Sequence, residues 1–395
     1  MKNSRRNFQM MITGGTISRA GTSAFALMIL WISLKLTGVP LIAGLADGLF
    51  SAPLFLSFIV GTMIDRTTHK KWIAVVSALC KAFSILLLYL AVLLNFFYST
   101  VFLIFLCVLA LGFATDVNNA VRSSWTKTFL SESDYKKGSA QINILESIAQ
   151  LTGYAISGVF LYIGLVRGIY ALVLIFLLAA LPILLIKTGL HETNAPEKKD
   201  GLMEGIAFLK GTRILQQIIF IGMLANIAIA MLGIGFTVLI QKDLKLPALY
   251  FSLIFIAISL GIIAGSVLSF RVKGKLGNIV FMSLLLISLS LFSLTLVHSV
   301  YLMYAPVFLA GFGVGLVNTP AQTALLREIP ENMIARSMGL FNMLALSGTF
   351  LSGTIGALVI ELSSVRVLFA LMGVMMGIGA LSALVFKEMR KSLIS

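Results

Sequence analysis

The feature that most constrains this chain is a succession of long apolar runs separated by short polar segments. A helix needs about 20 apolar residues to cross the hydrocarbon layer of a membrane. Only 11% of the 395 residues are charged, whereas a soluble domain carries about a quarter. The sequence therefore predicts an all-α membrane protein and excludes a water-soluble enzyme. The twelve predicted transmembrane helices cover residues 9–36, 41–64, 72–94, 100–121, 139–164, 168–188, 214–240, 249–270, 278–297, 300–322, 337–360 and 364–386.

The basic residues fall unevenly on the two sides of the predicted membrane. In the terminal segments, between the runs and at their ends, 23 Lys and Arg lie on the side of the amino terminus and five on the other, and cytoplasmic loops collect such residues. Both termini are therefore expected in the cytoplasm, with the protein in the cell (plasma) membrane. This bias and anionic lipid head groups explain the net charge of +15, so no nucleic-acid partner is expected. With two Cys and three scattered His, no metal site or cofactor is predicted.

A polar stretch near the middle of the chain divides the runs into two groups of six. The sequence predicts an amino-terminal six-helix bundle over 1–188, a cytoplasmic linker over 189–212 and a carboxy-terminal six-helix bundle over 213–395. Two such repeats around an axis normal to the membrane create a central cavity that opens alternately to either side. An offset of 199 residues superposes Asn119 on Asn318, Glu132 on Glu331, Lys137 on Arg336 and Asn143 on Asn342.

The loop after the second run carries a recognisable motif. It reads Gly61-Thr-Met-Ile-Asp65-Arg66-Thr-Thr-His-Lys70-Lys71. This resembles the G-x-x-x-D-R-x-G-R-K-K loop signature of the major facilitator superfamily, with substitutions at two signature positions. The corresponding segment of the second half, 265–275, keeps the spacing but has Ser269 in place of the acid. The segment 17–53 is also similar to the macrolide-efflux and enterobactin-exporter branch, and the resemblance implies the major facilitator fold of two pseudo-symmetric six-helix bundles.

The resemblance also implies that this loop helps to close the cytoplasmic face. It implies that Asp65 caps the eleventh helix near residues 336–337 and pairs with Arg122 at the basic end of the fourth. From the residues alone, Gly61 lets neighbouring helices approach closely. In the alternative interpretation, the basic residues of the loop only satisfy the positive-inside bias. The predicted gating residues are Gly61, Asp65, Arg66, Lys70, Lys71 and Arg122.

Five ionisable residues lie at membrane depth, more than two residues from either end of a predicted span, and all are in the first half. Each costs about 2.5–3.5 kcal/mol at the centre of a membrane, so such residues are functional candidates. Asp47 lies near the outer end of its helix, where water reaches it, and is interpreted as structural. Lys81 lies on a helix that is peripheral in the family, and its long side chain is expected to extend to the interface or to pair across helices. The proton-coupling candidates are Glu146, Asp116 and Arg19.

Polar and small side chains recur at helical spacing along several spans. The fifth span is the clearest, because positions 139, 143, 146, 150, 153 and 157 fall on one face. In lipid such a face turns inward, and similar stripes in helices 1, 4, 10 and 11 are expected to meet it. The alternative for the small residues, such as Gly153, is close helix packing. The cavity-lining candidates are Asn119, Asn143, Gln150, Asn226, Asn318, Gln322, Asn342 and Thr349.

Glu146 and Arg19 are predicted to lie at nearly the same depth. At a rise of about 1.5 Å per residue, Glu146 lies about 13 Å along its helix from Lys137, and Arg19 about 16 Å from Phe8. A conformational change that alters their separation would make Glu146 take up and release a proton, which couples proton flow to alternating access. The alternative is a Glu146–Arg19 ion pair that only fixes helix packing.

These features predict a secondary active exporter of small amphipathic molecules, such as a drug, a macrolide or a siderophore-like metabolite. The expected mechanism is alternating access with proton antiport, and the expected partners are the substrate, protons and the lipid bilayer, with the chain acting as a monomer. Two drug-antiporter patterns, an arginine at position 108 and a proline within 153–158, are absent. The first alternative is a proton-coupled importer or facilitator of a small metabolite. The second, an intramembrane enzyme, needs a paired-aspartate, H-E-x-x-H or serine–histidine arrangement, and the spans carry none.

Overall fold

The structure is a computed structural model that describes residues 2–65, 67–94, 96–130, 132–187, 208–329, 340–341 and 343–394. Among these residues, eleven helices are long and apolar enough to cross a membrane, and a shorter apolar helical stretch covers Pro40–Leu56. The all-α membrane fold predicted from the apolar runs is therefore confirmed. The described residues also include one short antiparallel pairing, β1 (Gly274–Lys275) with β2 (Leu393–Ile394).

The chain divides into two compact units. The first holds Met1–Glu197 together with Lys245–Ser252, and the second holds Lys198–Leu244 together with Leu253–Ser395. The boundaries drawn from the sequence, 1–188 and 213–395, stay a prediction. Most of the predicted linker, 189–212, lies outside the described residues.

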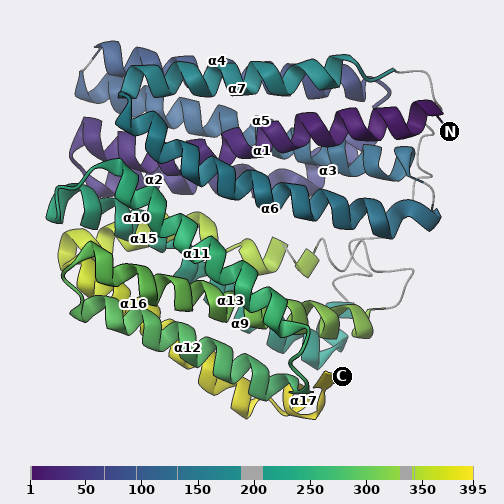
Figure 1. The fold of residues 1–395 in the computed structure, drawn as a ribbon, viewed down its shortest axis with the longest axis vertical. Coiled ribbons are helices and arrows are strands. Elements are labelled where there is room, and N and C mark those ends of the chain that lie inside the picture. Colours follow the sequence, from purple (N-terminus) through teal and green to yellow (C-terminus); the bar gives the residue numbers. More distant parts are fainter. Residues whose placement is uncertain are drawn as a thin grey trace. The chain divides into compact units, whose positions relative to one another are not determined.

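The first unit is a bundle of long helices around an apolar core (Figure 1). Its helical elements are α1 (Lys2–Thr37), α2 (Pro40–Ser51), η1 (Ala52–Leu56), α3 (Ser57–Asp65), α4 (Lys70–Leu94), α5 (Phe97–Phe129), α6 (Glu132–Tyr162) and α7 (Leu165–Leu184). α1 packs along α5, α6 and α7, and α4 packs along α5 and α7. Phe25, Met28 and Phe176 lie fully buried where these helices meet. This packing brings one face each of α1, α4 and α5 together.

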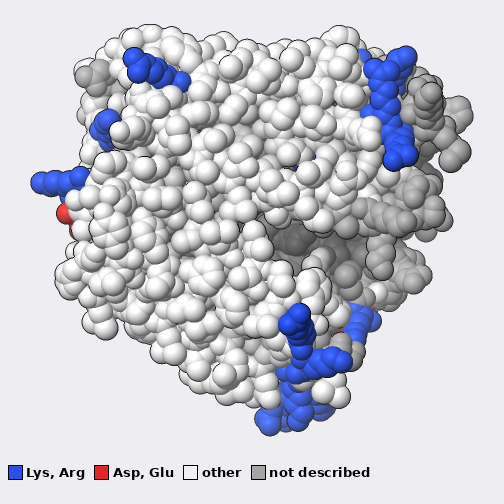
Figure 2. All heavy atoms as spheres, viewed as in Figure 1, with Lys and Arg blue, Asp and Glu red and all other residues white. Residues whose placement is uncertain are grey.

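The flanks of the helices carry exposed apolar side chains, as a membrane protein requires. Phe83 on α4 and Leu174 on α7 are among the many large apolar residues that are exposed. On the face shown in Figure 2, Lys and Arg gather near the helix ends, and residues of other types cover the flanks between them. Apolar exposed flanks with charged ends match the hydrocarbon layer and its two polar interfaces.

The second predicted span, 41–64, differs from the single helix expected. α2 passes into the 3-10 turn η1, and the chain continues as α3. Pro53 lies in η1, and proline has no backbone N–H and clashes with the preceding turn of an α-helix. The helix therefore tightens locally into a 3-10 turn. This bend packs closely on α5, because a Cβ at Gly112 would lie 3.2 Å from Cγ of Pro53.

The second unit is also helical. Its elements are α9 (Arg213–Ala230), α10 (Leu232–Val238), η2 (Leu239–Asp243), most of α11 (Ala248–Ser269), α12 (Leu276–Leu296), α13 (Val300–Glu328), α15 (Thr349–Leu362), α16 (Val365–Val385) and α17 (Lys387–Lys391). α12 packs along α13 and α16, and α9 packs along α15 and α16. The predicted span 214–240 is formed by α9, α10 and the π-helical turn η2.

Two pairs of glycines allow close helix packing in the second unit. Gly261 and Gly265 lie on α11, Gly311 and Gly315 lie on α13, and a Cβ at any of the four would overlap the backbone of the other helix. Such small-xxx-small pairs let transmembrane helices approach closely. By contrast, a Cβ at Gly61 would meet nothing within 4 Å. The expectation that Gly61 permits a close approach is therefore wrong for the residues that the structure describes, and its gating role stays a prediction.

Candidate functional site

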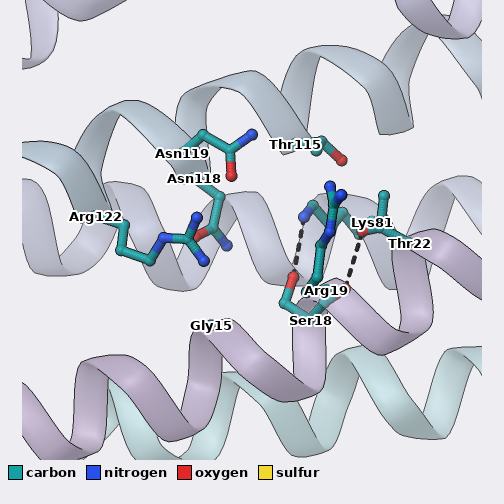
Figure 3. Close-up of a pocket in the computed structure, with 9 residues that line it drawn as sticks. All are labelled: Gly15, Ser18, Arg19, Thr22, Lys81, Thr115, Asn118, Asn119 and Arg122. Atoms are coloured by element: carbon teal, nitrogen blue, oxygen red, sulfur yellow. Dashed lines mark hydrogen bonds between the residues drawn. The ribbon is translucent and has the colours of Figure 1, made fainter. Parts of the chain in front are cut away.

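Three helices of the first unit, α1, α4 and α5, line a polar pocket (Figure 3). About 270 Å³ of space lies between the side chains, including space that is open to solvent. Such a concentration of polar groups within apolar helices marks a candidate site for substrate or ions. The lining residues are Gly15, Ser18, Arg19, Thr22, Lys81, Thr115, Asn118, Asn119 and Arg122.

Helical spacing explains how α1 and α5 contribute several residues each. Positions 15, 18, 19 and 22 on α1, and 115, 118, 119 and 122 on α5, recur at intervals of three and four residues, so each set lies on one helix face. Gly15 makes room for Arg122, because a Cβ there would lie 3.2 Å from Cδ and Nη1 of the arginine. The hydroxyls of Thr22 and Thr115 donate to main-chain carbonyls of their own helices at 2.9 Å and 2.8 Å. Their hydrogens are therefore already used.

Lys81 comes from α4 and is buried, with 2% of its surface exposed. Its Nζ donates to Oγ of Ser18 at 3.0 Å and lies 5.7 Å from the ring centre of Phe176. Of the two placements expected for Lys81, extension to the membrane interface and a contact across helices, the structure has the second. The face of α4 that carries Lys81 packs against other helices of the unit.

The periodicity of α4 carries a signal for this placement. Val76 and Phe83 are exposed, whereas Ser77 and Ala78 are buried. Lys81 follows Ser77 and Ala78 by four and three residues, so it lies on the same face as these small residues. Small residues favour close helix contacts in membranes. Large apolar residues on one side and small residues on the other therefore indicate that Lys81 faces inward.

Glu146 on α6 forms an ion pair with Arg122 on α5. Both side chains are mostly buried, with 26% of Glu146 and 19% of Arg122 exposed. Arg19 instead donates from Nη2 to Oε1 of Gln150 at 3.0 Å, and Gln150 in turn donates from Nε2 to the hydroxyl of Tyr154 at 2.7 Å. The predicted pairing of Glu146 with Arg19 is therefore wrong. The carboxylate is held by the arginine of α5.

The reason is the limited accuracy of depths counted along helices. Gln150 lies four residues beyond Glu146, which is about one turn or 5.4 Å. A depth estimate that is wrong by one turn therefore names Glu146 instead of Gln150 as the partner of Arg19. The resemblance also assigned Arg122 to Asp65, whose side chain lies outside the described residues, so that pairing stays a prediction.

Asp116, the second proton-coupling candidate, does not line this pocket. It lies on α5 with 6% of its surface exposed, and its hydrogen-bonding neighbour is Ser57 on α3. Its Oδ2 is buried without a hydrogen-bond partner among the described residues. The structure therefore brings Glu146 and Arg19 to the pocket region and places Asp116 toward α3.

The remaining sequence candidates fall in several places. In the first unit, Asn119 lines the pocket and Gln150 binds Arg19. In the second unit, Asn226 and Thr349 donate to main-chain carbonyls of neighbouring turns, and positions 318 and 322 are exposed on α13. The cavity role of these second-unit residues, Asn226, Asn318, Gln322 and Thr349, stays a prediction. The candidates whose side chains lie outside the described residues are Asp65, Arg66, Asn143 and Asn342.

Positive charge dominates the pocket. Arg19, Lys81 and Arg122 all line it, and both guanidinium groups act electrostatically on the Lys81 ammonium. Within the part of the chain that the structure describes, Nε of Arg19 and Nδ2 of Asn118 are buried without hydrogen-bond partners. The same part holds no cluster of three His, Cys, Asp or Glu side chains that could bind a metal ion. The pocket therefore offers hydrogen-bond donors in excess, beside one carboxylate that can carry a proton.

The whole chain is similar to known membrane transporters. Its sequence matches the family model described as Major Facilitator Superfamily over residues 11–353 and again over 218–393. No curated protein matches the sequence significantly. The solved structure of the nucleoside transporter NupG is 14% identical, with a TM-score of 0.75, and the match covers 99% of this chain and 100% of that one.

Two further solved structures have the same fold. An auto-inhibited POT family peptide transporter is 12% identical, with a TM-score of 0.78 and 97% of each chain covered. A bacterial homologue of the human lysosomal transporter Spinster, inward-facing and unoccupied, is 12% identical, with a TM-score of 0.77 and 99% of each chain covered. At these identities the likeness shows the fold alone, and the predicted major facilitator fold is confirmed. Because the family model matches most of its length, the chain belongs to the major facilitator superfamily and is a multi-pass membrane transporter of that type.

Proposed function

We propose that this chain is a secondary active exporter of small amphipathic molecules that works by alternating access and proton antiport. The cargo is a drug, a macrolide or a siderophore-like metabolite, and the chain acts as a monomer in the cell membrane with both termini in the cytoplasm. The observation that supports the proposal best is the Arg122–Glu146 ion pair, because it joins α5 to α6 within two candidate membrane spans.

Glu146 is the proton carrier in this proposal. An ionised carboxylate at membrane depth is stable only beside a counter-charge, which Arg122 supplies. A conformational change that separates the two side chains removes the counter-charge, and Glu146 then takes up a proton. Restoring the ion pair expels the proton. Uptake on one side of the membrane and release on the other couple the proton gradient to alternating access.

A second candidate is a proton-coupled importer of a small metabolite. One observation favours it, namely the excess of cations in the pocket. These cations attract an anionic substrate. An anion close to Glu146 repels the ionised carboxylate and therefore favours its protonated form. Substrate and proton then bind together and move in the same direction. In the exporter the two bind alternately.

The direction of transport separates the two candidates. A growth-inhibition panel of chemically varied toxic compounds, in cells with and without the gene, identifies a transported probe. Inverted membrane vesicles with an acidified lumen are expected to accumulate this probe, because protons that leave the lumen drive the probe inward in antiport. An importer instead empties such vesicles of the probe. Vesicles from cells that lack the gene are the control, and the absence of any protein-dependent movement contradicts both candidates.

A further inference from the structure

Two of the three cations in the pocket lack a counter-charge among the residues that the structure describes. The carboxylate of Glu146 is paired with Arg122. Lys81 donates to a serine hydroxyl and Arg19 to a glutamine side-chain oxygen, each at 3.0 Å, and both of these partners are neutral. Burial of a charge without a counter-charge is costly, and neutral hydrogen bonds offset only part of the cost. A bound anion would therefore stabilise these two cations.

Among the described residues, the buried side-chain atoms of this pocket that lack a hydrogen-bond partner are donors. Nε of Arg19 and Nδ2 of Asn118 are buried without hydrogen-bond partners in the described part of the chain. Lys81 has three N–H groups, and its hydrogen bond to Ser18 uses one of them. Donors on charged groups bind carboxylate and phosphate oxygens most strongly. The chemistry of these free groups thus matches an oxyanion and opposes a cation.

The donors come from three different helices and line the same pocket. Arg19 lies on α1, Lys81 on α4 and Asn118 on α5, and all three line the same pocket (Figure 3). The enclosed part of this pocket has a volume of only about 10 Å³, which is about the room that one water molecule needs. It therefore admits an oxygen atom of a charged group, with the remainder of that molecule extending beyond it.

We propose that Arg19, Lys81 and Asn118 form an oxyanion subsite that binds a carboxylate or phosphate group of the transported molecule. The substrate is then an amphipathic organic anion rather than a neutral or cationic compound. This inference rests on the proposed transport function, because it names the substrate class of the same pocket, and an anionic substrate favours the importer candidate, in which substrate and proton bind together. It assigns Lys81, which no loop signature or coupling argument explains, to substrate recognition.

Binding of four matched probes to the purified full-length protein in phosphatidylcholine nanodiscs tests the subsite. The probes are benzoate, phenyl phosphate, benzyl alcohol and phenyltrimethylammonium, and the readout is the rise in the unfolding temperature with probe concentration. We expect at least one of the two anions to stabilise the protein and the alcohol and the cation to have no effect. Stabilisation by benzoate alone identifies a carboxylate site, and stabilisation by phenyl phosphate alone identifies a phosphate site. Stabilisation by both anions identifies a general oxyanion site.

Variants assign the binding to these residues. Loss of a hydrogen bond to a charged group costs about 1.5–3 kcal/mol, so Lys81→Met is expected to weaken anion binding about tenfold or more. Lys35→Met is the matched control, because Lys35 is exposed near the end of α1, and it should bind the anions as the wild type does. Arg19→Gln provides the same test if Lys81→Met fails to fold.

Three results would overturn the subsite. They are the absence of binding by both anions, equal binding of the alcohol or the cation, and wild-type anion affinity in the Lys81→Met and Arg19→Gln variants. Failure of the subsite and failure of the transport proposal are distinguishable. A neutral probe that is transported unchanged by Lys81→Met refutes the subsite and leaves transport standing. Anion binding by a protein that moves nothing in vesicles supports the subsite and refutes transport.

Discussion

Replacement of Glu146 by Gln is expected to abolish transport driven by a proton gradient in proteoliposomes, while exchange of substrate at equal concentrations continues. Glutamine has nearly the same shape but cannot gain or lose a proton, so the step that links the gradient to alternating access disappears. Exchange requires only that the protein changes conformation with substrate bound, and this step does not involve the proton. Exchange is therefore expected to persist. We expect the gradient-driven rate to fall to that of liposomes without protein, and we expect uptake of a radiolabelled probe with and without a pH difference to show it.

Control variants distinguish a loss of proton coupling from a loss of folded protein in this experiment. Glu388→Gln changes a partly exposed carboxylate on α17 whose ion pair is with Lys391 in the same helix, and it should transport as the wild type does. Glu146→Gln leaves Arg122 without its partner, and an unpaired buried charge is destabilising. The double variant Arg122→Gln, Glu146→Gln removes both charges and serves as the folded reference. Gradient-driven transport that survives in folded Glu146→Gln protein excludes Glu146 as the proton carrier.

Substitution of Gly265 by Leu is expected to prevent stable folding of the second unit. A Cβ at Gly265 would already overlap the backbone of α13 at Phe312, so the larger side chain forces α11 and α13 apart. Overpacking typically costs about 1–3 kcal/mol and sometimes more, and here the obstacle is backbone that cannot change rotamer. We expect a cost at or above about 3 kcal/mol. The yield of monodisperse protein and its unfolding temperature in detergent measure it.

Gly61→Leu is the matched control for this prediction. Gly61 and Gly265 occupy corresponding positions of the loop signature in the two halves, but a Cβ at Gly61 would meet nothing within 4 Å. Its replacement should leave the unfolding temperature within a few degrees of the wild type. Equal stability of the two variants would show that the close approach of α11 to α13 does not limit stability.

The helices could be predicted from the sequence because the membrane imposes a length and a composition on each one. The apolar runs located the spans, and the all-α membrane fold is confirmed. The bend in the second span could not be predicted in this way, because Pro53 changes the helix type without changing the hydropathy of the span. A hydropathy pattern records which residues avoid water, and it carries no information on how the backbone bends.

The pocket was only partly predictable. Arg19 and Asn119 were recognised as polar residues at helical spacing, and Arg122 as a gating residue that the resemblance implies, and all three line it. Helix rise alone could not choose between Gln150 and Glu146 as the partner of Arg19, because the two lie one turn apart on α6. Lys81 was named from the sequence but was not assigned to the pocket, because the face of a helix that turns inward depends on its neighbours. The sizes of the residues around Lys81 contained that information.

The most direct test of the account is a measurement of protons exchanged when substrate binds to the purified protein. The protein is placed in weakly buffered solution with a pH-sensitive dye, and the probe identified in the growth panel is added. The proposed antiport predicts that the wild type releases protons in proportion to the probe bound and that Glu146→Gln releases none. Proton uptake would replace antiport by the importer mechanism. A proton change that is equal in the wild type and in Glu146→Gln would contradict the central claim that this carboxylate couples protons to transport.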